Sequence, residues 1–65
     1  MKPNNSAAKI LETVVENGRV DNDDNGDFDR DSLITEVEFE AALGGLSPDE
    51  TAKVVEWALA HARTN

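Results

Sequence analysis

The fold is indicated most clearly by residues 47–63, which read SPDETAKVVEWALAHAR. A serine followed by proline, with glutamate three residues after the serine, is a strong start signal, because the serine and glutamate side chains satisfy free N–H groups at a helix N-terminus. Apolar residues then recur every three or four positions, which places them on one helix face. They are Val54, Val55, Trp57, Ala58, Leu59 and Ala62. The segment predicts a helix over residues 47–63.

Two shorter helices are predicted before this one. Residues 6–17 carry one apolar stripe, and Gly18 suits the left-handed conformation that is common just after a helix. Residues 35–43 begin with Thr35 and Glu38 at capping-box spacing and stop at a pair of glycines. The chain is therefore expected to contain three helices.

Residues 19–32 separate the first two predicted helices and are a run of Asp, Asn and Gly with few apolar side chains. This composition is typical of a loop. We expect a long acidic loop here, followed by Leu33 and Ile34 as a short extended pair. The predicted fold class is all-α, a single small three-helix domain over residues 1–65. The expected core residues are Leu11, Val14, Leu43, Val55 and Leu59.

The size and composition of the chain argue against an enzyme. A chain of 65 residues buries roughly 60% of its unfolded surface, which leaves little room for a catalytic pocket. There is no cysteine, so neither a disulfide framework nor a thiolate zinc site is available. His61 is the one histidine, and its place near a helix C-terminus suits a partner of the helix dipole. We expect no catalytic residue.

The sequence also bears on location. No apolar stretch reaches the roughly 18 residues that a membrane span requires, and residues 1–5 lack the layout of a secretory signal. We expect a soluble, cytoplasmic protein that does not contact a membrane.

Acidic residues outnumber basic ones by 14 to 6, which gives a formal charge of −8, and residues 21–38 hold eight of the carboxylates. This charge repels phosphate groups and favours cations or basic partner surfaces. Solubility, or adaptation to high salt, would explain the same acidity without any binding role. The candidate partner-binding residues are Asp21, Asp23, Asp24 and Trp57, the last because tryptophan often anchors a protein interface.

Residues 27–38, DFDRDSLITEVE, resemble the calcium loop of EF-hand proteins, and the resemblance extends through the apolar Phe39 to Leu43. In that family, oxygen ligands come from loop positions 1, 3, 5, 7 and 9 and from a bidentate glutamate at position 12. The resemblance implies calcium as a cofactor. It implies metal ligands at Asp27, Asp29, Asp31, the Leu33 carbonyl, Thr35 and Glu38.

The match departs from the family at two points. Ser32 takes the place of the usual turn glycine, and no predicted helix runs directly into the loop. A second register that begins at Asp21 places Asp23, Asn25 and Gly26 well, but it puts Ser32 where the bidentate glutamate belongs. Both registers stay open at this point.

The succession of three helices also resembles the helical part of winged-helix domains. The resemblance rests on residues 10–20, on Leu33-Ile34-Thr35 with its capped helix, and on LGGLSP at 43–48. In that family the second and third helices form a helix-turn-helix, and the third enters the DNA major groove. The first exposed positions of the third helix would include Asp49 and Glu50, so direct DNA binding is not expected.

The sequence thus favours a non-enzymatic regulatory or adaptor module that binds a protein partner through its acidic loop and helix faces, with calcium ordering the loop. One alternative is a winged-helix-like transcriptional or phage-type regulator. Another is an acidic decoy that imitates the charge of DNA against a nucleic-acid-binding protein.

Overall fold

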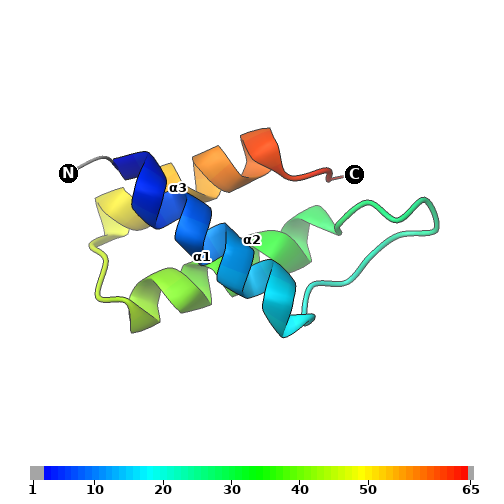
Figure 1. Cartoon of the computed structure of the whole chain (residues 1–65), viewed down its shortest axis with the longest axis horizontal. Coiled ribbons are helices and arrows are strands. Elements are labelled where there is room, and N and C mark those ends of the chain that lie inside the picture. The colour runs from blue at the N-terminus through cyan, green and yellow to red at the C-terminus, as the bar shows by residue number, and fades with distance from the viewer. Residues whose placement is uncertain (1–2, 65) are drawn as a thin grey trace.

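Three helices form the framework of the protein. The computed structural model describes residues 3–64, with α1 at Pro3–Asn17, α2 at Arg30–Leu43 and α3 at Pro48–His61. Each helix packs against both others, and α1 lies across α2 and α3 (Figure 1). Within residues 3–64 the extended pairing is limited to two isolated β-bridges. The expected all-α, three-helix class is confirmed.

The start of α3 forms as its sequence predicts. The Ser47 hydroxyl accepts from the Glu50 N–H at 3.2 Å, and the Glu50 carboxylate accepts from the Ser47 N–H at 3.0 Å. This reciprocal pair satisfies two N–H groups that the helix itself cannot. The helix ends at His61 rather than at residue 63, because Ala62 is extended and the Arg63 carbonyl accepts from the Phe28 N–H at 2.8 Å.

The start of α2 differs from its prediction. The helix begins at Arg30, and its N-cap is Asp29, whose carboxylate accepts from the Ser32 N–H at 3.0 Å. The predicted Thr35 capping box is wrong, since the Thr35 hydroxyl donates to the Asp31 carbonyl at 2.9 Å inside the helix. The extended pair predicted at 33–34 is likewise helical.

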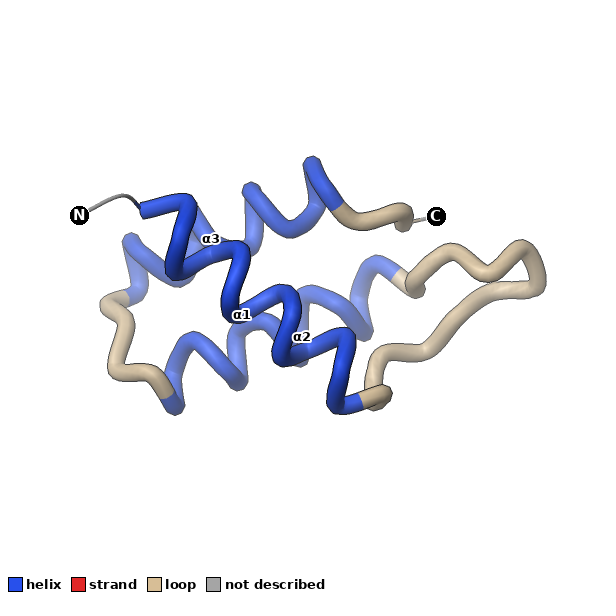
Figure 2. Tube along the Cα trace, in the orientation of Figure 1, coloured by secondary structure: helices blue, strands red, loops and turns tan. Residues whose placement is uncertain are grey.

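The connection between α1 and α2 is shorter than the predicted loop over 19–32. It comprises residues 18–29 and projects beyond the helices at one end of the molecule, away from the α2–α3 turn (Figures 1 and 2). Gly18 has a φ of 68° and ends α1 as expected. The long acidic loop is therefore not borne out. With its cap at Asp29, α2 includes residues 30–32, which were predicted to be the last part of the loop. We call residues 18–29 the acidic connection.

The core is made of small and medium side chains from all three helices. Its buried members are Ala7, Val14, Leu33, Val37, Ala41, Val54 and Ala58 on the helices, together with Val20 in the acidic connection. The burial of Val14 is confirmed, whereas Leu11, Val55 and Leu59 are half-buried against the core. The prediction for Leu43 is wrong, since its side chain is 68% exposed. Leu43 lies about 200° around the helix from Ala41, on the side away from the core.

Candidate functional site

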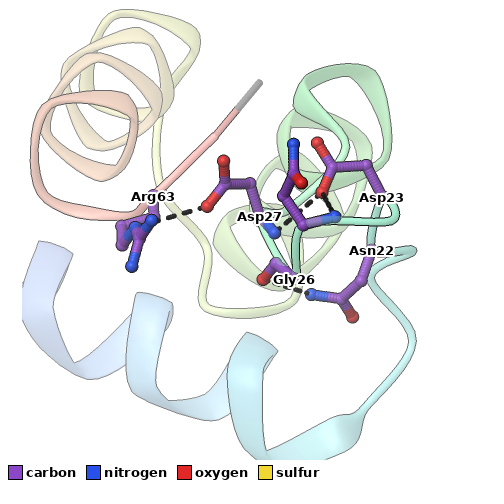
Figure 3. A network of polar contacts seen from close by, with 6 residues as sticks. Asn22, Asp23, Gly26, Asp27 and Arg63 are labelled. Carbon is purple, nitrogen blue, oxygen red and sulfur yellow. Dashed lines mark hydrogen bonds and ion pairs between the residues drawn. The ribbon is translucent and has the colours of Figure 1, made fainter.

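The tip of the acidic connection is a turn held together by its own polar groups (Figure 3). One carboxylate oxygen of Asp23 accepts from the backbone N–H groups of Asn25 and Asp27, both at 2.9 Å. The Asp23 N–H donates to the Asp27 carbonyl at 2.8 Å, and the Asn22 side chain donates to the Gly26 carbonyl at 3.2 Å. Gly26 has a φ of 84°, a conformation that glycine adopts without strain. These contacts define one conformation of the turn.

Both ends of this turn are tied to the helical framework. On one side, the Asp29 N–H donates to the Asp21 carbonyl at 2.8 Å, and the Asp21 N–H donates to the Ser32 hydroxyl on α2 at 3.1 Å. On the other side, Phe28 bridges to Thr64, and the Asp27 carboxylate lies 3.3 Å from the Arg63 guanidinium. The segment after α3 therefore holds the acidic connection in place.

The residues predicted as calcium ligands from the first register do not form one loop. Asp27 and Asp29 lie in the acidic connection, where the first pairs with Arg63 and the second caps α2. The others lie on α2 itself. They are Asp31, Leu33, Thr35 and Glu38. Since α2 begins at Arg30, the fourth position of the 27–38 register, most of these positions are helical, and calcium binding through them stays a prediction.

The second register, from Asp21, fits the local backbone better. Gly26 occupies the turn position with a positive φ, and α2 begins directly after Asp29, the ninth position. The twelfth position is Ser32, whose hydroxyl accepts from the Asp21 N–H. In the part of the chain that the structure describes, no three His, Cys, Asp or Glu side chains are grouped to hold a metal. Ser32 thus supplies no carboxylate at the position where the EF-hand family has its bidentate glutamate.

The predicted partner-binding residues fall into two separate regions. Asp21 and Asp24 are exposed on the acidic connection, and Asp23 is half-buried because its carboxylate orders the turn. Trp57 lies elsewhere, half-buried on α3. The structure therefore brings the three aspartates together and separates them from the tryptophan.

Trp57 lines a groove of about 750 Å³ between the beginning of α1, the α2–α3 turn and α3. Its apolar lining includes Ala7, Leu46, Val54, Trp57 and Ala60. Sequence reasoning missed this groove, because it depends on how the N-terminal half of α1 lies against α3. The signal that was available is the stripe of small and aromatic residues on α3.

The charged groups at this groove include Glu50, Lys53 and Glu56, all on α3. Hydrogen bonds from the Ser47 backbone and hydroxyl, and the nearby Lys53 ammonium, lower the pKa of Glu50 below its ordinary value. Glu50 therefore keeps its negative charge at the groove to a lower pH than an isolated glutamate would.

Two apolar side chains on α2 are also exposed away from the groove. Phe39 is 49% exposed and Leu43 is 68% exposed, and they lie one helical turn apart on the same face.

None of the helices within residues 3–64 is both long and apolar enough to cross a membrane.

Comparisons of the chain with family models, with curated proteins and with solved structures found no match.

Proposed function

We propose that this chain is a non-catalytic adaptor module that binds a basic surface of a protein partner through the acidic connection. The observation that carries the proposal is that this segment is both rich in carboxylates and held in one conformation by its own hydrogen bonds. Asp21 and Asp24 are presented at exposed positions on this ordered backbone. A segment ordered before binding loses less conformational freedom when a partner docks.

The overall charge supports the same partner chemistry. A formal charge of −8 on a chain of 65 residues creates a negative field that attracts a basic surface and raises its association rate. The field repels the phosphate groups of nucleic acids. At the start of α3, where a recognition helix would meet DNA, Asp49 and Glu50 are exposed, so the adaptor function is favoured over a DNA-binding regulator.

A second candidate is weak calcium binding by the register that begins at Asp21. The positive φ of Gly26 and the start of α2 directly after Asp29 favour it. Because Ser32 replaces the bidentate glutamate, we expect binding no tighter than roughly 10⁻⁴ M, the weak end of the range for such loops. On this proposal calcium would bind to an acidic connection that its own hydrogen bonds already order, and its folding would not require calcium.

The adaptor function is tested with a displayed library of random peptides selected against the chain at physiological salt. We expect enrichment of peptides rich in Lys and Arg. Their affinity should fall in a variant that combines Asp21→Asn with Asp24→Asn, because it removes two exposed carboxylates and leaves intact the hydrogen bonds that the Asp23 carboxylate accepts in the turn.

The matched control combines Glu12→Gln with Glu16→Gln, two exposed positions on α1. Both double variants change the formal charge from −8 to −6, since each removes two of the 14 acidic residues. We expect the control to lose less than about twofold in affinity and the Asp21/Asp24 variant to lose about tenfold, or 1.4 kcal/mol. Equal losses would show that net charge alone attracts the peptides, which would refute a role for this segment.

A further inference from the structure

The groove beside Trp57 is an interaction surface separate from the acidic connection. Its lining residues come from α1, the α2–α3 turn and α3, and the turn lies at the opposite end of the molecule from residues 18–29 (Figure 1). Along α3 the lining extends from Glu50 to His61, which corresponds to about 16 Å, or three helical turns. A surface of this length matches a short helical segment of a partner.

Small residues at several positions of the lining help to keep the groove open. Ser6, Ala7, Gly44, Gly45 and Ala60 all line it, and none of them carries a side chain large enough to fill the space beside the indole. Gly45 has a φ of 79°, so a larger residue there would strain the turn. In the α2–α3 turn the backbone conformation of Gly45 disfavours a larger side chain, and on α1 and α3 the lining residues Ser6, Ala7 and Ala60 are themselves small.

Trp57 is held in a fixed orientation before any partner arrives. Its indole stacks on the His61 imidazole, with ring centroids 4.0 Å apart and an angle of 16° between the planes. The His61 Nδ1 lies 2.9 Å from the Trp57 carbonyl oxygen, and because that oxygen only accepts, Nδ1 carries the hydrogen. A tryptophan fixed at a groove wall makes an interface anchor at low entropic cost.

Resting on the adaptor function, we propose that this groove takes the apolar face of an amphipathic, basic helix from the partner. An apolar side chain of that helix packs against Trp57, and its Lys or Arg residues face the carboxylates of Glu50 and Glu56, which outnumber the one lysine of the lining, Lys53. Charge complementarity with a chain of −8 selects a basic helix. A second copy of this chain would bring the same negative charge to the groove, so it is disfavoured as the occupant.

The experiment uses three synthetic peptides of about four helical turns. The first has leucines at positions i, i+3, i+4 and i+7 with lysines elsewhere. The second peptide has the same composition as the first, but its leucines are distributed over all faces of the helix. The third peptide keeps the leucine positions of the first and has glutamate in place of every lysine. Trp57 is the one tryptophan of the chain, so its fluorescence reports directly on the groove.

Ala60→Leu fills the groove at an exposed position on α3, and leucine is a good helix former. Ala8→Leu is the matched control, because Ala8 is exposed on α1 and does not line the groove. We expect the first peptide to shift the Trp57 emission and to bind Ala60→Leu about tenfold more weakly, with Ala8→Leu within about twofold of the wild type. Circular dichroism checks that each variant is folded, and Ala60→Gln provides a second, uncharged block should Ala60→Leu unfold.

The outcomes separate this inference from the adaptor function. If the second peptide binds as tightly as the first, or if Ala60→Leu binds as the wild type does while the Asp21/Asp24 variant is weakened, the groove inference is overturned and the adaptor function stands. If Ala60→Leu weakens binding and the Asp21/Asp24 variant does not, the groove inference stands and the function proposed for the acidic connection fails. A homodimer that Ala60→Leu abolishes in sedimentation would identify a second copy as the occupant and overturn the inference.

Discussion

Leu33 and Leu43 on α2 should respond in opposite ways to the same substitution. Leu33 is fully buried at 0% exposure, so Leu33→Ala leaves a cavity and should cost roughly 2–5 kcal/mol of unfolding free energy. Leu43 is 68% exposed, so Leu43→Ala should change that free energy by no more than about 0.5 kcal/mol. A domain of 65 residues has a total stability of roughly 3–10 kcal/mol, so the first change removes a large share of it.

Urea denaturation followed by far-UV circular dichroism and by Trp57 fluorescence measures both variants. For a slope of about 1 kcal/mol per molar urea, the lower end of the usual range, the midpoint of Leu33→Ala should fall by about 2 M or more, while that of Leu43→Ala stays within about 0.5 M. A Leu43→Ala loss equal to or larger than that of Leu33→Ala would show that α2 faces the core with its other side. That result would refute the packing of α2 through Leu33.

Three further predictions concern caps, pH and calcium. Asp29→Ala should lower the unfolding free energy by about 0.5–2 kcal/mol, because it leaves the Ser32 N–H at the start of α2 without its acceptor; an unchanged urea midpoint would contradict the cap. The pKa of Glu50 is lowered by its hydrogen bonds from Ser47, so its contribution is present above the unfolded pKa and is lost as the pH falls through the lower folded value. Ser47→Ala should therefore flatten the acid side of a plot of melting temperature against pH, and an unaltered slope would count against the linkage. Glu38→Gln should leave the amide shifts caused by millimolar calcium unchanged, because Glu38 lies outside the register that begins at Asp21 and ends at Ser32; their loss in this variant would support the 27–38 register instead.

The elements that the sequence predicts well are those whose signals are local and unopposed. The serine, proline and glutamate at 47–50 act on neighbouring N–H groups, and no competing start signal lies nearby. Gly18 ends α1 for a similarly local reason, since its positive φ is needed only at that residue. The three-helix class follows from such signals together with the apolar stripes.

The start of α2 could not be decided in this way, because two start signals overlap. Thr35 with Glu38 and Asp29 with Ser32 both have cap chemistry at suitable spacing. Tertiary packing decides which of the two signals starts the helix. With the earlier start, Leu33 is part of α2 and its side chain is fully buried in the core. The later start, at Thr35, made the predicted acidic loop too long.

The candidate site was predictable only in part. The exposed aspartates follow from composition, and the order of the turn follows from Asn, Asp and Gly side chains close in sequence. The pairing of Arg63 with Asp27 and the groove beside Trp57 join residues far apart in the chain. No rule on spacing reports such contacts, because they depend on how α1 and α3 are placed by the shared core.

The central claim, that the acidic connection is the partner-binding segment, is tested most directly by an amide NMR titration of the chain with a library-selected basic peptide. The prediction is that the largest shifts occur at residues 18–29, with Asp21 and Asp24 among them, while the equally charged and exposed Glu12 and Glu16 on α1 stay nearly unchanged. Small shifts of similar size at carboxylates over the whole surface, or shifts that leave residues 18–29 unaffected, would contradict it.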